Sequence, residues 1–140
     1  MTIRLEQLES QLQQGLKPVY IVSGDEPLQV QEACQLIRSA AKAALFDERE
    51  TFNVDNNFNW NELLTAGNAL SLFASQKLIE LNLPTGKPGA EGSKALLSYA
   101  QSPSDNNLLL INSGKLDKSA KNSKWFKTLV NIATHIEIWP

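Results

Sequence analysis

The sequence is poor in cysteine, contains no long apolar run and has no excess of positive charge. Its single cysteine, Cys34, excludes an intramolecular disulfide and suits a reducing compartment. No stretch approaches the roughly eighteen apolar residues of a membrane-spanning helix. The first residues, MTIRLEQLESQLQQ, are charged and amphipathic and lack the apolar run of a signal peptide. These absences predict a cytoplasmic protein.

The balance of charge excludes a global attraction to polyanions. Thirteen Lys and Arg residues against 15 Asp and Glu residues give a net charge of −2. Any contact with nucleic acid would therefore have to be local. The length of 140 residues, 42% of them hydrophobic, is typical of one domain that can bury a proper core.

The sequence also lacks a recognisable nucleotide-binding loop. The turn after the first apolar strand reads SGDEPLQ and has neither the glycines nor the Lys-Ser/Thr pair of the motif G-x-x-x-x-G-K-[ST]. Asp25 and Glu26 would put negative charge where phosphate oxygens bind. The glycine-rich range 86–94 misses the spacing, and Gly114 has no upstream glycine partner.

Other catalytic constellations are equally weak. Cys34 falls in the apolar stripe of a helix and is predicted to be a core residue. His135, the only histidine, has no nucleophile or metal-ligand spacing around it, which predicts a surface or strand-end position. Asp25 and Asp55 follow two strands, as in a Mg²⁺-dependent phosphoacceptor site, but Pro84 follows the next strand and no acceptor aspartate is there. Helix capping and turn formation also explain both acids.

Helical and strand patterns alternate along the chain. Asp25 is expected to cap the second helix, with Pro27 in its first turn, and Asn59 is expected to cap the third. The segment 84–93, with two Pro and three Gly, is expected to be a loop. The pattern predicts an α/β fold, a doubly wound, five-stranded, mainly parallel sheet. The predicted helices cover 2–14, 26–45, 60–69, 94–101 and 118–133, and the predicted strands cover 19–24, 50–54, 77–83, 107–112 and 135–139.

Large apolar residues stand in the short turn before the third strand. Leu70, Leu72 and Phe73 lie where a turn normally carries Gly, Asn, Asp or Ser. Such side chains either fill the core or form a contact surface for another protein. The pattern alone leaves both readings open.

Lysines recur every three residues near the end of the chain. On a continuous helix, Lys121, Lys124 and Lys127 lie opposite the apolar side that carries Trp125 and Phe126. This arrangement is typical of an ordinary solvated face, and it also fits a patch that contacts DNA or an acidic protein.

Three stretches, taken in this order, resemble a known family. They are IRLEQLESQLQQGLKPVYIVSGDEPLQVQEA, LSLFASQKLIEL and LLLINSGKLDKSAKNSKWF. The chain resembles, over essentially its whole length, the N-terminal domain of the delta subunit of bacterial DNA polymerase III, the wrench of the sliding-clamp loader. The specificity of the resemblance comes from the combination of stretches, because no single one would suffice.

The resemblance implies an AAA+ or RecA-like nucleotide-binding fold that has lost its nucleotide site, with ATP hydrolysis left to sister subunits. It implies a domain that binds the beta sliding clamp and helps to open the ring for loading onto primed DNA. Leu72 and Phe73 would enter an apolar pocket of the clamp, with Leu70 and Ser71 beside them. Met is frequent in the family where this chain has Leu70, a change that conserves volume.

The resemblance further implies no catalytic residue, cofactor or metal in this chain, although the parent assembly is a DNA-directed DNA polymerase holoenzyme. The family's protein continues into a lid domain and a C-terminal collar domain, so we expect 1–140 to be one domain of a longer protein. Other loader subunits would be partners of that full-length protein, and DNA only within the loader complex. The alternative from the residues is a Mg²⁺-dependent phosphoacceptor or nucleotide-binding signalling domain.

Overall fold

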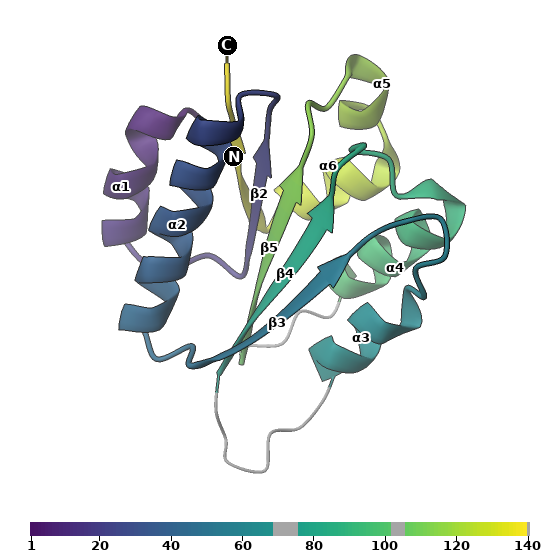
Figure 1. The fold of residues 1–140 in the computed structure, drawn as a ribbon, viewed down its shortest axis with the longest axis horizontal. Helices are drawn as coiled ribbons and strands as arrows, with labels where there is room; N and C mark the ends of the chain where they lie inside the picture. Colours follow the sequence, from purple (N-terminus) through teal and green to yellow (C-terminus); the bar gives the residue numbers. More distant parts are fainter. Residues whose placement is uncertain (69–75, 102–105, 140) are drawn as a thin grey trace.

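A computed structural model describes residues 1–68, 76–101 and 106–139 of the chain. In these residues the centre of the molecule is one sheet of six strands, in the order β1-β6-β2-β5-β4-β3 (Figure 1). Every neighbouring pair is parallel. The strands are β1 (Thr2–Ile3), β2 (Val19–Ser23), β3 (Glu48–Asn53), β4 (Lys77–Leu83), β5 (Asn107–Ser113) and β6 (Ala133–Glu137).

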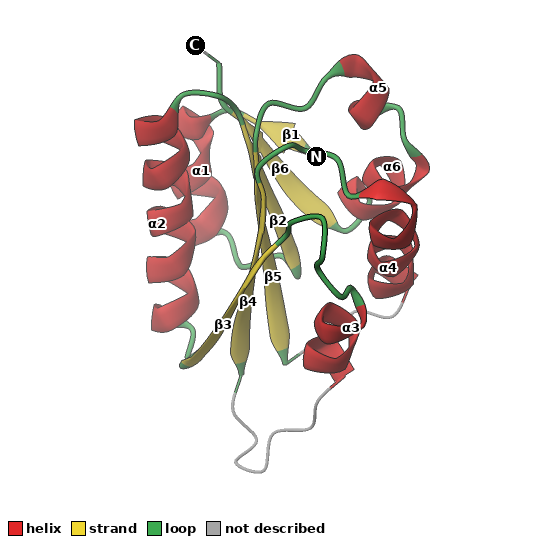
Figure 2. Ribbon diagram, turned by 45° about the vertical axis from the view of Figure 1, so that its right-hand side comes forward, coloured by secondary structure: helices red, strands yellow, loops and turns green. Residues whose placement is uncertain are grey.

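Helices cover both faces of the sheet, as the alternating pattern predicted (Figure 2). One pair of helices lies on one face and a second set on the other, while a short helix lies near the carboxyl edge of the strands. The first pair is α1 (Leu5–Gln13) and α2 (Pro27–Ala43), the second set is α3 (Asn61–Asn68), α4 (Gly89–Gln101) and α6 (Lys124–Val130), and the short helix is α5 (Lys118–Lys121). Among the described helices, none is long and apolar enough to cross a membrane. The predicted doubly wound α/β fold is confirmed.

Two apolar cores hold these layers together. All five residues of β2 are buried because helices cover it on both sides. Cys34 is 1% exposed in the core under α2, as predicted, and burial raises the pKa of its thiol to about 11. The core under α1 and α2 includes Leu8, Tyr20, Ile37, Leu110 and Ile136, and the core under α3, α4 and α6 includes Ile21, Leu63, Ile79, Leu96, Leu109 and Leu129.

The predicted strand count was wrong by one, because the chain begins with a strand. Thr2 and Ile3 pair in parallel with His135 and Ile136 of β6, where a helix from residue 2 was expected. The helix begins only after Arg4, whose backbone N–H donates to the Gln7 side chain at 3.0 Å. A two-residue strand is too short to show an alternating pattern.

The helix predicted for 118–133 is broken into α5 and α6. Ser123 has an extended backbone and its hydroxyl accepts a hydrogen bond from the Phe126 N–H at 3.4 Å, which starts a second helix. Asp117 caps the first helix through the Ala120 N–H at 2.7 Å. Ala133, the last residue of the predicted helix, belongs to β6.

The structure also tests three predictions about the residues at which helices begin. The expected loop 84–93 is shorter, since α4 begins at Gly89. Pro27 lies in the first turn of α2 as predicted, but Glu26 rather than Asp25 takes the cap position, without a side-chain hydrogen bond. Asn59 precedes α3 as predicted, and its side chain accepts from the Asn61 N–H at 3.0 Å.

A buried carboxylate ties α2 to the edge of the sheet. Glu80 in β4 is 2% exposed and points to the α2 side. It accepts a hydrogen bond from Arg38 Nε of α2 at 2.7 Å and forms an ion pair with Arg49 of β3. These contacts compensate the cost of burying the charge.

His135 lies in the interior of β6, so the predicted surface or strand-end position was wrong. Its side chain is 1% exposed, and its Nε2 lies 2.6 Å from Ser23 Oγ. The Phe126 ring meets it edge to face, with the centroids 5.1 Å apart. Burial lowers the pKa of His135 to about 4, against the nearby Glu137 carboxylate, which raises it.

This buried imidazole predicts a loss of stability in acid. The unfolded chain takes up the proton near pH 6.5 and the folded chain only near pH 4, so the free energy of unfolding should fall as pH drops between these values. The contribution is at most roughly 3 kcal/mol. Urea unfolding should show that the unmodified chain and His135→Gln differ less in their free energy of unfolding at pH 4.5 than at pH 7. Equal losses in both proteins would contradict this origin.

Candidate functional site

A cleft lies at the carboxyl edge of the strands, where parallel α/β sheets usually bind ligands. Its volume is about 310 Å³. The turn between β2 and α2 forms one side of it. The cleft is lined by Gly24, Asp25, Pro27, Val30, Asn53, Val54, Asn82, Pro84, Asn112, Ser113 and Gly114.

The turn beside this cleft is short and is covered by the residues that follow β6. Only Gly24 and Asp25 separate the last residue of β2 from Glu26, the cap of α2. A Cβ on Gly24 would lie 2.6 Å from the Cβ of Ile138, and the Ile138 N–H donates to the Ser23 carbonyl at 2.8 Å. Helix N-termini bind phosphate through free N–H groups. Here Pro27 removes one donor and two carboxylates flank the helix start.

The acids considered for a phosphoacceptor site do not form a recognisable metal centre. Asp25 is exposed and lines the cleft. The Asp55 carboxylate accepts a hydrogen bond from the Asn57 N–H at 2.9 Å, as expected for a turn-forming residue. Within the described parts of the chain, no group of three His, Cys, Asp or Glu residues could hold a metal ion.

The predicted clamp-contact residues lie outside the described residues. Leu70, Ser71, Leu72 and Phe73 belong to the range 69–75, which joins α3 to β4. The residues that border this range are described on both sides. They lie at the amino edge of the sheet, opposite the carboxyl-edge cleft (Figure 1).

The end of α3 is fixed by a buried side chain of β5. Asn107 is 7% exposed, and its Nδ2 donates to the Gly67 carbonyl at 2.8 Å. The ring of Tyr99 lies against Gly67, so that a Cβ there would be 2.9 Å from the Tyr99 Cε2. The backbone of α3 therefore approaches α4 more closely than a larger residue would allow.

The start of β4 is fixed from both neighbouring strands. The Lys77 N–H donates to the Asn106 carbonyl at 2.9 Å, and its ammonium group bonds the Glu50 carboxylate at 3.0 Å. The Gln76 carbonyl accepts from the Glu48 N–H at 3.3 Å. Neither Asn106 nor Asn107 was singled out from the sequence. A polar residue opening the otherwise apolar strand NLLLIN was the available signal.

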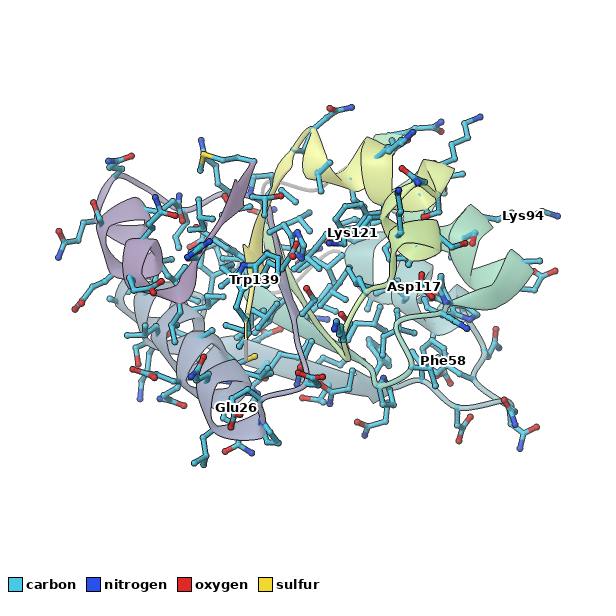
Figure 3. All side chains as sticks on the ribbon, turned by 90° about the horizontal axis from the view of Figure 1, so that it is seen from above. Glu26, Phe58, Lys94, Asp117, Lys121 and Trp139 are labelled. Carbon is cyan, nitrogen blue, oxygen red and sulfur yellow. The ribbon has the colours of Figure 1, made fainter. Side chains whose placement is uncertain are left out.

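The three lysines predicted to share a helix face are divided between two helices. Lys121 lies in α5 and donates to both oxygens of Glu137 at 3.2 Å, so its charge is partly neutralised. Lys124 and Lys127 lie in α6 and are exposed. Figure 3 looks onto the carboxyl edge and shows Lys121 and Glu26 on opposite sides of Trp139, with Lys94 extending outward from α4.

The chain is similar to proteins of one family. A family model described as DNA polymerase III, delta subunit, matches residues 20–138. The DNA polymerase III subunit delta of Escherichia coli (strain K12) is 37% identical over 131 residues, 94% of this chain and 38% of that protein. The subunit delta of Haemophilus influenzae (strain ATCC 51907 / DSM 11121 / KW20 / Rd) is 34% identical over 124 residues, 89% of this chain and 36% of that protein.

A solved structure shows the same fold. The Bacillus subtilis DNA clamp loader delta protein matches with a TM-score of 0.72 at 23% sequence identity, over 95% of this chain and 42% of that chain. The present chain thus spans less than half the length of each of these relatives. The match to the family model covers most of the six-stranded sheet and all of the described helices except α1. The chain belongs to the DNA polymerase III delta subunit family.

Proposed function

We propose that this chain is the clamp-binding domain of a clamp-loader delta subunit and that it acts by binding, without covalent chemistry. The observation that carries the proposal is the family match, which spans the range 69–75 together with the elements on either side. Leu72 and Phe73 are the contact residues, with Leu70 and Ser71 beside them. The beta sliding clamp is the partner, and the compartment is the cytoplasm.

The energetics of a Leu-Phe contact suit this role. Burying each side chain on a partner yields roughly 1.5 to 3 kcal/mol, enough to anchor an interface of otherwise neutral contacts. A wedge opens a ring only if it binds the open clamp better than the closed clamp, because equal affinity for both shifts no equilibrium. We therefore propose that the domain captures or induces a strained clamp conformation and so helps to load the ring onto primed DNA.

The carboxyl-edge cleft supports the second part of the proposal, an AAA+-type fold without a working nucleotide site. A turn of two residues before the α2 cap has no room for the loop that wraps phosphates in G-x-x-x-x-G-K-[ST] proteins. Asp25 and Glu26 oppose an anion there. ATP hydrolysis would belong to other subunits of the loader, which are partners of the full-length protein.

A more local proposal concerns the basic side of α6. Lys124 and Lys127 are exposed, and no ion pair involves them among the described residues, whereas Lys121 is held by Glu137. We propose that Lys124 and Lys127 contact DNA phosphates when the domain is part of the loader complex. Lys121 would contribute less, because its charge is already paired.

The first prediction concerns the contact residues. Leu72→Ala/Phe73→Ala should weaken binding to the cognate sliding clamp at least a hundredfold, since two anchors of roughly 1.5 to 3 kcal/mol each are lost. Surface-bound clamp titrated with each protein gives the affinity, and thermal melting shows that the variant is folded. Leu28→Ala/Leu45→Ala is the matched control, because both leucines are exposed on the α2 side, at 78% and 67%.

Equal binding of the two double variants would show that the contact lies elsewhere. Unfolding of Leu72→Ala/Phe73→Ala alone would instead make Leu72 and Phe73 core residues. Either result would remove the proposed contact from the range 69–75.

The second prediction concerns nucleotide. A ligand that binds the folded state raises the melting temperature by mass action. Millimolar ATP with Mg²⁺ should leave the melting temperature of this chain unchanged, and so should Mg²⁺ alone. A rise that Asp25→Asn or Asp55→Asn abolishes would favour the alternative, a phosphoacceptor or nucleotide-binding signalling domain.

The third prediction concerns the basic side of α6. In a loader assembled with the full-length subunit, Lys124→Gln/Lys127→Gln should reduce the slope of log affinity for primed DNA against log salt by up to about 2. Lys17→Gln/Lys42→Gln, which removes the same charge from exposed positions elsewhere, is the control. Equal effects of both pairs would mean that only net charge matters. Impaired assembly of Lys124→Gln/Lys127→Gln would point to a neighbouring subunit as the partner of this face.

A further inference from the structure

The two segments that border the range 69–75 are both hydrogen-bonded to the same dipeptide, Asn106–Asn107. The side chain of Asn107 donates to the Gly67 carbonyl at 2.8 Å, at the end of α3. The backbone carbonyl of Asn106 accepts from the Lys77 N–H at 2.9 Å, at the start of β4. One point at the beginning of β5 therefore holds the exit of the helix and the entry of the strand.

The Asn107 contact is unusual for its position in the sheet. The next four residues of β5 are apolar and buried, and an amide buried among them is costly unless it is hydrogen-bonded. The last carbonyls of a helix have no partner within the helix. Asn107 supplies one of the missing donors to α3, and both groups are shielded from water, where an unmade hydrogen bond is most costly.

Side-chain packing also holds the end of α3 and the start of β4 in place. Gly67 lies against the Tyr99 ring, where a Cβ would come within 2.9 Å of Cε2, so the end of α3 lies close to α4. On the strand side, Lys77 is held a second time by Glu50 of β3 at 3.0 Å. The spacing between Gly67 and Lys77 is thus set by residues of β3, α4 and β5, all of which lie outside the range 69–75.

We propose that Asn106–Asn107 is a positioning element for partner binding, which fixes the two ends of the range that carries Leu72 and Phe73. The inference rests on the proposed function. Fixed positions of Gly67 and Lys77 reduce the ordering of α3 and β4 that binding a partner would otherwise require. Without the Asn107 donor the last turn of α3 loses its anchor, and the complex dissociates faster.

The test compares the clamp affinity of Asn107→Leu with that of the unmodified chain. Leucine has the same number and branching of side-chain heavy atoms as asparagine and cannot donate to the Gly67 carbonyl. One lost hydrogen bond of typical strength should weaken binding about three- to tenfold, mostly through the dissociation rate. Asn107→Ser is the second variant if the first does not fold. Surface-bound cognate clamp gives the rates, at a temperature where melting curves show all proteins folded.

The matched control is Tyr20→Phe. It removes two hydrogen bonds in the layer on the opposite face of the sheet: the Tyr20 hydroxyl donates to Gln11 at 2.9 Å and accepts from the Lys17 N–H at 3.1 Å. The proposal expects Tyr20→Phe to bind like the unmodified chain. A purely structural role of Asn107 would lower the melting temperature of Asn107→Leu and leave its affinity for the clamp unchanged at a temperature where it is folded.

The outcomes separate this inference from the proposed function. Clamp binding by the unmodified chain that is weakened by Asn107→Leu and not by Tyr20→Phe supports both. Unchanged binding of Asn107→Leu, or an equal loss in Tyr20→Phe, overturns the positioning role and leaves the clamp contact intact. If the unmodified chain does not bind the clamp at all, the proposed function fails and the positioning role fails with it.

Discussion

All strand pairs of the sheet run in the same direction, and this constraint determines what each edge can do. Because the strands are parallel, the chain between one strand and the next must cross a face of the sheet. These crossings cover β2 and β5 on both faces, and the chain enters and leaves each strand at one of two edges. The carboxyl edge carries the cleft and the short turn at Gly24. The amino edge carries the junction of α3, β4 and β5. The two edges are therefore available for separate roles.

Ligand-binding α/β folds usually bind their ligands at the carboxyl edge, whereas the range that carries the proposed contact is bordered by residues at the amino edge. At the carboxyl edge Ile138 packs on Gly24, and acids flank the helix start where a phosphate would need donors. At the amino edge buried polar groups fix the ends of α3 and β4.

The sequence allowed prediction of those parts of the fold whose signals are local and repeated. The stripe containing Cys34 and Ile37 predicted the buried side of α2, and the continuous apolar run of β5 predicted a strand covered on both faces. Signals of one or two residues were missed. Thr2 and Ile3 form a strand only because β6 offers them a free edge. Ser123 starts a new helix within a stretch that the apolar spacing alone predicts to be one continuous helix.

Long-range polar contacts were the other missed class. The burial of His135 depends on Ser23, which is 112 residues away, and Asn107 finds Gly67 at a distance of 40 residues. The spacing of residues along the sequence does not indicate such pairs. For the candidate site, the pattern singled out Leu70, Leu72 and Phe73 as either core or contact residues, and the resemblance favoured a contact. Asn106 and Asn107 could be recognised only from the contacts among α3, β4 and β5.

The Glu80 cluster implies a constraint on how sequences in this family can diverge. The buried Glu80 carboxylate forms ion pairs with Arg38 of α2 and with Arg49 of the edge strand β3. Replacing Glu80 alone removes the shared partner of both guanidinium groups at once, whereas replacing one arginine alone still leaves the buried carboxylate one partner. Acceptable mutational paths therefore lose an arginine before they lose the acid, and the order of substitutions at these three positions is expected to be directional.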